Sequence, residues 1–423
     1  MKNSMKGAIQ KSLLYSQVLA LFLFPPLSIY ANDTTPMPYP VFHKGMSYVT
    51  WNKESFASTF SDTSLLLMKK CGVESVAIIV TRYQDRFDST EIRATDRTPS
   101  DSSVRHAIRK AHEYGMKVML KPHIDLIIDE GCTRSDIGFC TSREWEKWFA
   151  NYLAFITHYA RMAGDEDVEF FCVGTELSFA TQEEGFWRDS VIKDVRRLFK
   201  GQITYAANWD AYKNVKFWDL LDYVGIDAYF PVAKKSNATR DEILSGWKSW
   251  LAEIEAFQKT VDKPVIFTES GYCSAGTASN RPWENALKRV TPNTLLQKEC
   301  YEALVDTFWD KPWFFGVYWW AWNTYPESGG ENDPSFTPQN KPAMEYLRET
   351  YCRPLGREFA FIPSSKTAPE GSEIVRKLAV EAAKRKARCA CPAGDVSFTG
   401  ELAREERRAL TADSRLTHQP PGM

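Results

Sequence analysis

The sequence predicts a (β/α)8 barrel that takes up most of the 423-residue chain. Short apolar runs typical of buried parallel strands alternate with segments of helical period, which is the pattern of this fold. No glycine-rich phosphate loop follows the first run, as it usually would in a doubly wound open sheet. Eight strands are predicted, at Gly45–Val49, Ser75–Val80, Lys117–Leu120, Glu169–Val173, Ile203–Ala206, Tyr223–Ile226, Val265–Phe267 and Phe315–Tyr318.

The segments between these strands carry helix start and stop signals. Gly72 and Gly115 each stand just before a predicted strand, where the C-cap of a helix belongs. Ser142 opens a helix with Glu144 in its first turn, where the helix dipole stabilises a carboxylate. The clearest helices are predicted at Ser102–Tyr114, Ser142–Arg161, Glu242–Thr260 and Asn293–Trp309.

The two ends of the chain differ in composition from the barrel. Residues 1–31 are typical of a secretory signal peptide, because a positively charged start precedes an apolar stretch too short to span a bilayer comfortably; a signal anchor is the alternative. Residues 32–43 form a proline-rich leader, 44–357 the barrel, and 358–423 a linker and a disordered basic tail. We therefore expect a secreted or otherwise extracytoplasmic protein, with no membrane contact after signal removal.

Charge and cysteine content narrow the classes of function. The formal net charge is −1, which argues against a nucleic-acid partner. No spacing of cysteine and histidine suggests a metal site, and no cofactor is expected. Cys132 and Cys140 flank a short polar loop and are the best candidates for a disulfide. The 14 tryptophans fit either exposed stacking surfaces, as in carbohydrate sites, or a large core.

Two glutamates follow runs that should be buried. Glu176 comes after EFFCVGT and Glu269 after PVIFT, at strand ends that meet at the catalytic face of such a barrel. An unpaired charge there costs several kcal/mol, so each is either functional or closes its strand with a salt bridge to Arg82 or Lys121. Hydrolysis of a glycosidic bond needs such a pair, one acid for the leaving oxygen and one carboxylate for the anomeric carbon.

The segments that surround these glutamates resemble glycoside hydrolase family 113, a clan A group whose characterised members include β-mannanases. The resemblance runs from about Lys44 to Tyr351, on the segments KGMSYVTW, MLKPHID, FFCVGTELS, ITYAANWDAY, FWDLLDYVGIDAYFPV, KPVIFTESGY and GVYWWAWN. It implies a retaining double displacement with Glu176 as acid/base and Glu269 as nucleophile. Many clan A enzymes carry Asn before the acid/base to contact the sugar 2-hydroxyl. This chain has Thr175 there, and Asn208 is a candidate substitute.

Other polar and aromatic residues at the strand ends are candidates for binding substrate. Tyr229 either donates a hydrogen bond to Glu269 or is a core tyrosine with a satisfied hydroxyl. Trp320 and Trp322, at alternate positions of one strand, should point to the same side, where at least one of them is a platform for the cleaved sugar. The alternative is that both fill the barrel core. The predicted substrate-binding residues are Trp51, Lys121, His123, Asn208, Trp209, Tyr229, Trp320 and Trp322.

We therefore expect a monomeric glycoside hydrolase that acts on a β-linked polysaccharide or oligosaccharide, mannan above all. A catalytically silent carbohydrate-binding barrel is one alternative, although a binding module has no need of two buried carboxylates. A transglycosylase that uses the same residues is the other.

Overall fold

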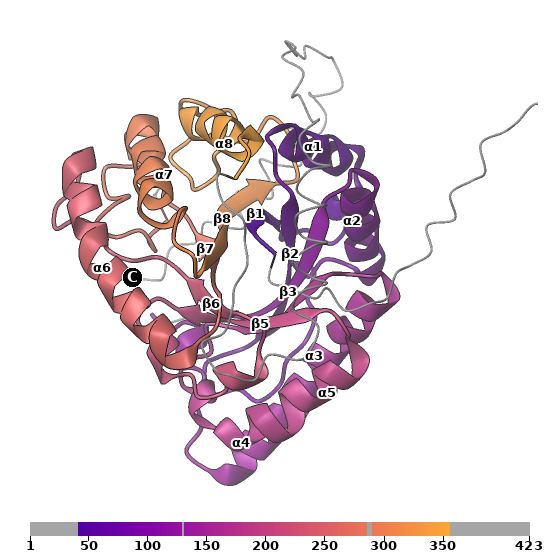
Figure 1. Cartoon of the computed structure of the whole chain (residues 1–423). Coiled ribbons are helices and arrows are strands. Elements are labelled where there is room, and N and C mark those ends of the chain that lie inside the picture. The colour runs from indigo at the N-terminus through magenta and orange to yellow at the C-terminus, as the bar shows by residue number, and fades with distance from the viewer. Residues whose placement is uncertain (1–40, 129–130, 286–289, 356–423) are drawn as a thin grey trace, which may run out of the picture. The chain divides into compact units, whose positions relative to one another are not determined.

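The computed structural model describes residues 41–128, 131–285 and 290–355. Eight parallel strands pair in chain order, and the last pairs with the first, so the sheet is a closed barrel (Figure 1). This confirms the predicted (β/α)8 fold. The strands are β1 (His43–Val49), β2 (Ser75–Gln84), β3 (Lys117–Leu126), β4 (Phe170–Thr175), β5 (Gln202–Asn208), β6 (Val224–Asp227), β7 (Val265–Ser270) and β8 (Phe314–Asn323).

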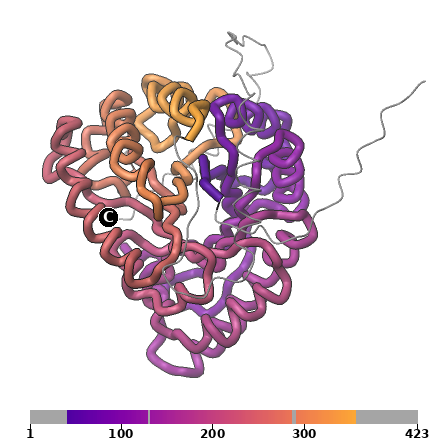
Figure 2. Tube along the Cα trace, viewed as in Figure 1, coloured from indigo at the N-terminus to yellow at the C-terminus, as the bar shows by residue number. Residues whose placement is uncertain are grey.

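Helices cover the outside of the barrel and lead the chain from one strand to the next (Figures 1 and 2). The β5–β6 connection is the exception within the described chain, because it contains only two short 3-10 helices, Tyr212–Asn214 and Trp218–Leu220. The α-helices are α1 (Thr59–Lys70), α2 (Asp101–Glu113), α3 (Ser142–Asp165), α4 (Glu184–Phe186), α5 (Lys193–Leu198), α6 (Arg240–Val261), α7 (Thr294–Phe308) and α8 (Pro342–Cys352). A π-helical turn, Trp187–Ile192, joins α4 to α5.

The predicted helix signals correspond to observed caps. Gly72 and Gly115 follow α1 and α2 with φ of 81° and 69°, a backbone conformation that glycine adopts without a Cβ clash. Helix α3 begins at Ser142, as predicted, and Thr141 caps it: the Thr141 hydroxyl accepts from the Glu144 N–H while the Glu144 side chain binds the Thr141 N–H. Such a cap contributes about 1 kcal/mol to helix stability.

The core has two layers, divided by the sheet. Outside the barrel, a large cluster fills the space between strands and helices, and the fully buried Trp148, Trp187 and Trp247 belong to it. These tryptophans are therefore core residues. A large core is one of the two explanations that the sequence offered for the number of tryptophans. The inner layer is small and is made of Val49, Ala77, Ile79, Met119, Phe170, Cys172, Ala206, Tyr223, Ile266, Phe315, Tyr318 and Ala321.

Several strands run further than their apolar runs predicted. Strand β3 continues beyond Leu120 to Leu126, and β2 continues beyond Val80 to Gln84. Ladder pairing between these two strands persists to Gln84 and Leu126, so the backbone stays extended although the side chains become polar. The polar ends are therefore held on regular strands, which fixes the direction of their side chains.

Some predictions concern residues that the structure does not describe. The signal peptide, most of the leader and the whole tail lie outside the described residues, while β1 begins at His43, one residue before the predicted start of the barrel. Within the described ranges, no helix has both the length and the apolar character needed to cross a membrane. The suggested Cys132–Cys140 disulfide is wrong: both thiols are free, with Cys132 packed partly against the core and Cys140 exposed.

Candidate active site

Strands β4 and β7 deliver the two predicted carboxylates to the mouth of the barrel. Glu269 is part of β7 and is 3% exposed. Glu176 is the first residue after β4, and its side chain is 17% exposed. Its φ of 52° is rare for a residue with a Cβ, and its N–H donates to the Ala206 carbonyl of β5 at 2.8 Å. The turn at Glu176 thus ends the strand and is anchored to its neighbour.

The Glu269 carboxylate is held at both of its oxygens. The Tyr229 hydroxyl donates to Oε2 at 2.9 Å, as predicted from its position after β6. The Lys121 ammonium donates to Oε1 at 2.5 Å. Burial and the adjacent Glu269 raise the pKa of Tyr229 well above its ordinary value, so its hydroxyl stays protonated and remains a donor. These contacts fix the orientation of the Glu269 carboxylate.

A buried ion pair lies beneath Glu269. Lys121 and Asp227 have fully buried side chains, with Nζ 3.1 Å from Asp227 Oδ1. Burial alone would lower the pKa of Lys121, but the carboxylates of Asp227 and Glu269 raise it above its ordinary value. Lys121 therefore carries a permanent positive charge under the site. The predicted direct contact between Lys121 and a sugar hydroxyl does not fit this burial, whereas the suggested salt bridge to a glutamate is present.

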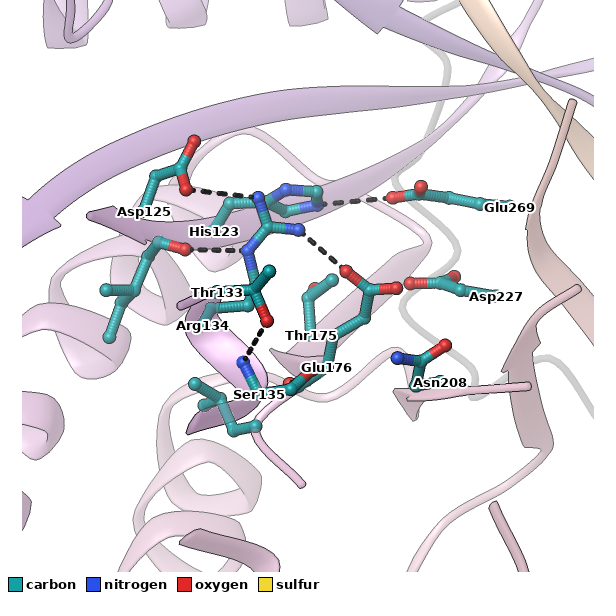
Figure 3. Close-up of polar contacts among 12 residues, drawn as sticks. His123, Asp125, Thr133, Arg134, Ser135, Thr175, Glu176, Asn208, Asp227 and Glu269 are labelled. Carbon is teal, nitrogen blue, oxygen red and sulfur yellow. Dashed lines mark hydrogen bonds and ion pairs between the residues drawn. The ribbon is translucent and has the colours of Figure 1, made fainter. Parts of the chain in front are cut away.

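Glu176 is held from a loop. Arg134, in a short 3-10 helix (Arg134–Asp136) after β3, donates from Nη1 to Glu176 Oε2 at 2.8 Å and from Nε to the Ile124 carbonyl at 2.8 Å. Figure 3 shows its guanidinium between the carboxylates of Asp125 and Glu176. The Ser135 hydroxyl adds a bond to the Glu176 carbonyl at 2.9 Å. One loop therefore fixes both the backbone and the side chain of Glu176.

The pKa of Glu176 is raised. Burial is the largest cause and Glu269 adds to it, while Arg134 and Lys121 act in the opposite direction. The pKa of Asp227 is raised as well, by burial and by Glu269, while Lys121 lowers it. Asp227 and Glu269 both contact the Lys121 ammonium, whereas Glu176 contacts Arg134 instead. Glu176 is also the most exposed of the three, at 17% of its side chain, so it is the carboxyl group best placed to exchange a proton with a ligand.

His123 and Trp320 lie beside Glu269. The His123 Nε2 is 3.5 Å from Glu269 Oε1, and the imidazole is parallel to the Trp320 indole, with ring centroids 6.2 Å apart. Burial, Lys121 and Arg134 lower the pKa of His123 well below its usual value, so the ring is neutral. Figure 3 shows His123 facing Glu269 across the mouth. A neutral imidazole and a half-buried indole therefore border the nucleophile candidate.

The prediction that Trp320 and Trp322 share one side of β8 is wrong. Trp320 packs against the inner layer, whereas Trp322 is buried in the outer layer and donates from Nε1 to the Ser64 hydroxyl of α1 at 2.8 Å. The β1–β8 register shifts between Met46 and Tyr48, so alternation along β8 is interrupted next to these tryptophans. Trp322 is a packing residue, and Trp320 alone of this pair can floor a sugar site.

The other predicted binding residues are distributed around the mouth. Trp51 is half-buried against the inner layer, next to the end of β1. Trp209 is half-buried and lies directly after β5. Its backbone N–H donates to Asn208 Oδ1 at 2.9 Å. Figure 3 places the Asn208 amide on the same side of the mouth as Asp227 and Glu176, while Thr175 is buried. Asn208 is therefore better placed than Thr175 to meet a ligand.

Two residues of the site are absent from the predicted set of site residues. Asp227 is the last residue of the apolar strand β6, a signal close to the one that identified the two glutamates, so it could have been included. Arg134 stands in a polar loop without apolar periodicity, and only the fold brings it to Glu176. In the described ranges no three His, Cys, Asp or Glu side chains are grouped as metal ligands. The site thus brings two carboxyl groups with different surroundings to one barrel mouth.

Comparison with known proteins identifies the family of this chain. The profile of Glycoside Hydrolase Family 113 matches residues 46–341. A solved GH113 β-1,4-mannanase is 28% identical, with a TM-score of 0.67, over 74% of this chain and 99% of that one. A GH113 β-mannanase from Alicyclobacillus acidocaldarius is 25% identical, with a TM-score of 0.66, over 74% and 97%. No curated protein sequence matches. The profile covers well over half of the chain, which therefore belongs to glycoside hydrolase family 113.

Proposed function

We propose that this glycoside hydrolase cleaves β-1,4-linked mannan with retention of configuration, with Glu176 as acid/base and Glu269 as nucleophile. The observation that carries the proposal is the unequal environment of the two carboxyl groups. Glu269 accepts hydrogen bonds from Lys121 and Tyr229, which hold its two oxygens in place for attack. Glu176 is buried beside a second carboxylate, and its raised pKa favours the protonated acid. The solved mannanases of the same family supply the substrate class.

The reaction then has two steps. First, a Glu269 oxygen bonds to the anomeric carbon as the bond from that carbon to the leaving oxygen breaks, and the Glu176 proton passes to the leaving oxygen. Second, the Glu176 carboxylate takes a proton from water while the water oxygen bonds to the anomeric carbon and frees Glu269. Each step inverts the anomeric carbon, so the product retains the original configuration.

The neighbouring groups have distinct roles in this proposal. Lys121 and Tyr229 hold the two Glu269 oxygens before and after attack, which limits the reorganisation needed in the transition state. Trp320 stacks on the apolar face of the sugar, and Asn208 meets its hydroxyls. Because His123 is neutral, it accepts or donates a hydrogen bond without adding charge near the oxocarbenium-like carbon.

The test is incubation of the purified protein with mannan, glucomannan, cellulose and xylan, with the first-formed anomer followed by nuclear magnetic resonance. We expect mannan to be cleaved fastest and the β-anomer to appear before mutarotation. An initial α-anomer would contradict retention. Binding without cleavage would identify a silent carbohydrate-binding barrel, and products longer than the substrate would identify a transglycosylase.

A further inference from the structure

Trp283 lies exposed at the barrel mouth, in the loop after β7. It is 48% exposed, a high value for so large an apolar side chain. Its indole is stacked on that of Trp209, with ring centroids 5.8 Å apart and planes 12° apart. Trp209 thus covers one face of Trp283. The exposed half of the residue is left for a further contact.

The loop that carries Trp283 is anchored to the neighbouring β6–α6 connection. The Ser279 carbonyl accepts the N–H groups of Val232 and Ala233 at 2.8 and 3.0 Å, and the Gly276 carbonyl accepts the Asn237 N–H at 2.7 Å. Beneath the indole, Trp209 is itself supported at its edge by Trp250, with ring centroids 5.7 Å apart. Trp283 is therefore held on a backed platform, which limits the entropy lost when a ligand binds.

An apolar strip connects Trp283 to the carboxylate pair. Trp320, beside Glu269, packs against a small cluster that also contacts Trp209, and Trp209 carries Trp283. The side chains of this cluster are buried, so the strip reaches the surface at the half-buried Trp320 and Trp209 and at the exposed Trp283, three indoles that the contacts above connect from Glu269 outward. The cluster between Trp320 and Trp209 consists of Tyr229, Cys273, Ala275 and Phe336.

We propose that Trp283 is the platform of an outer subsite that binds a sugar ring of the polysaccharide, away from the ring that is cleaved. The inference rests on the proposed function and extends it to the recognition of long chains. A pyranose ring offers an apolar C–H face to an indole and hydroxyls at its edge. Arg281 and Glu284, paired at 2.9 Å on either side of Trp283 in sequence, are half-exposed and supply polar partners for such hydroxyls.

The occupant is a sugar chain because of what the strip joins. A surface for a second protein would extend outward from Trp283, whereas the contacts described run inward to Glu269. A chain that reaches both ends of the strip must have more than one ring. Binding at Trp283 therefore adds to the recognition of long substrates, and contributes little to that of the shortest one cleaved.

The experiment compares the full chain with its Trp283→Ala and Trp283→Phe variants on β-1,4-mannooligosaccharides of two to six sugars. For Trp283→Ala, we expect kcat/KM on mannohexaose to fall about tenfold, and that on the shortest substrate cleaved to fall less than about twofold. Phe, which keeps a flat ring, should restore part of the loss. Leu66→Ala, at an exposed apolar residue of α1, is the matched control and should leave all rates unchanged.

Equal losses at every length, or no loss at all, would overturn the subsite, and a lower Tm with equal losses would identify Trp283 as a packing residue. Failure of the proposed function is a separate result, in which the wild-type chain cleaves none of these sugars. Calorimetric titration with mannohexaose, cellohexaose and xylohexaose then decides the matter. Binding weakened about tenfold by Trp283→Ala supports the subsite, and equal affinity, or no binding of any of the three, rejects it.

Discussion

The surroundings of Glu269 and Glu176 differ although the two residues share one barrel mouth. Glu269 lies within a strand, and its partners Lys121 and Tyr229 come from β3 and from directly after β6. Glu176 lies just beyond a strand with a left-handed backbone, and its main partner is the loop residue Arg134. The first carboxylate is fixed by residues of the barrel strands and their ends, and the second by the loop after β3.

This difference matters because the two glutamates need opposite protonation states in the proposed mechanism. An ammonium and a phenol donate to the two oxygens of Glu269. Glu176 faces burial and a second carboxylate that raise its pKa, against a guanidinium that lowers it. Two identical side chains thus have different surroundings, which is the arrangement that the proposed acid and nucleophile require. The predictions below change one set of surroundings at a time.

The largest effect is expected for Glu269→Ala. Loss of the nucleophile should lower kcat by about 10⁴-fold or more. Lys121 keeps Asp227 as a partner, so the variant should fold, which its Tm will check. Added azide should restore part of the turnover and give an inverted product, detected by the anomer formed. Undiminished hydrolysis would remove Glu269 from the mechanism.

Glu176→Gln should lower kcat on mannan by about 10²–10⁴-fold, because an amide cannot protonate the leaving oxygen. Activity of the wild type should fall as pH rises through the raised pKa of Glu176, since the acid form is then lost. The variant should lack this loss of activity at high pH, which is the basic limb of the pH profile. Its rate should recover most with an aryl mannoside, whose leaving group needs no proton. The control is Glu183→Gln, later in the same segment. A Glu176→Gln enzyme that kept both rate and limb would require another acid.

Trp320→Ala and Trp322→Ala should separate catalysis from packing on one strand. Trp320, next to His123, should contribute about tenfold to kcat/KM, or ~1.4 kcal/mol of transition-state stabilisation. Trp322 fills the outer layer, and its loss should cost about 3–5 kcal/mol of stability with little change in the kinetics of the folded fraction. The kinetics and the Tm of both variants distinguish the binding role from the packing role. A kinetic loss confined to Trp322→Ala would contradict these positions.

The sequence predicted the fold and the two carboxylates because these depend on local pattern. Apolar runs mark buried strands, and a charged residue directly after one is visible without a structure, as Glu176 and Glu269 were. The same pattern failed for Trp322, since alternation holds only on a regular strand and the β1–β8 register shifts beside it. The burial of Lys121 was equally hidden, because its depth depends on Asp227 and Glu269, more than 100 positions away.

Arg134 shows where the limit lies, and Arg134→Gln is the prediction with the smallest effect on rate. A loop residue without periodicity gives no sign of its reach, yet its guanidinium is 2.8 Å from Glu176. Removing it takes away a cation that lowers the pKa of Glu176, while burial and Glu269 still raise that pKa. The acid form should then persist to higher pH. The basic limb of kcat/KM should move upward in pH, with a loss of less than about tenfold at the optimum.

Arg134→Lys keeps the charge but not the fork that binds Ile124 and Glu176 together, so its basic limb should lie between those of the wild type and Arg134→Gln. Arg188→Gln is the control, because this substitution changes the net charge by the same amount. Arg188 pairs with Glu184 and Asp219, outside the site. The basic limb of kcat/KM for the Arg188→Gln variant should stay at the pH of the wild type. If Arg134→Gln lowered the rate at every pH without moving the limb, Arg134 would only position Glu176, and the proton on Glu176 would be governed by burial and Glu269 alone.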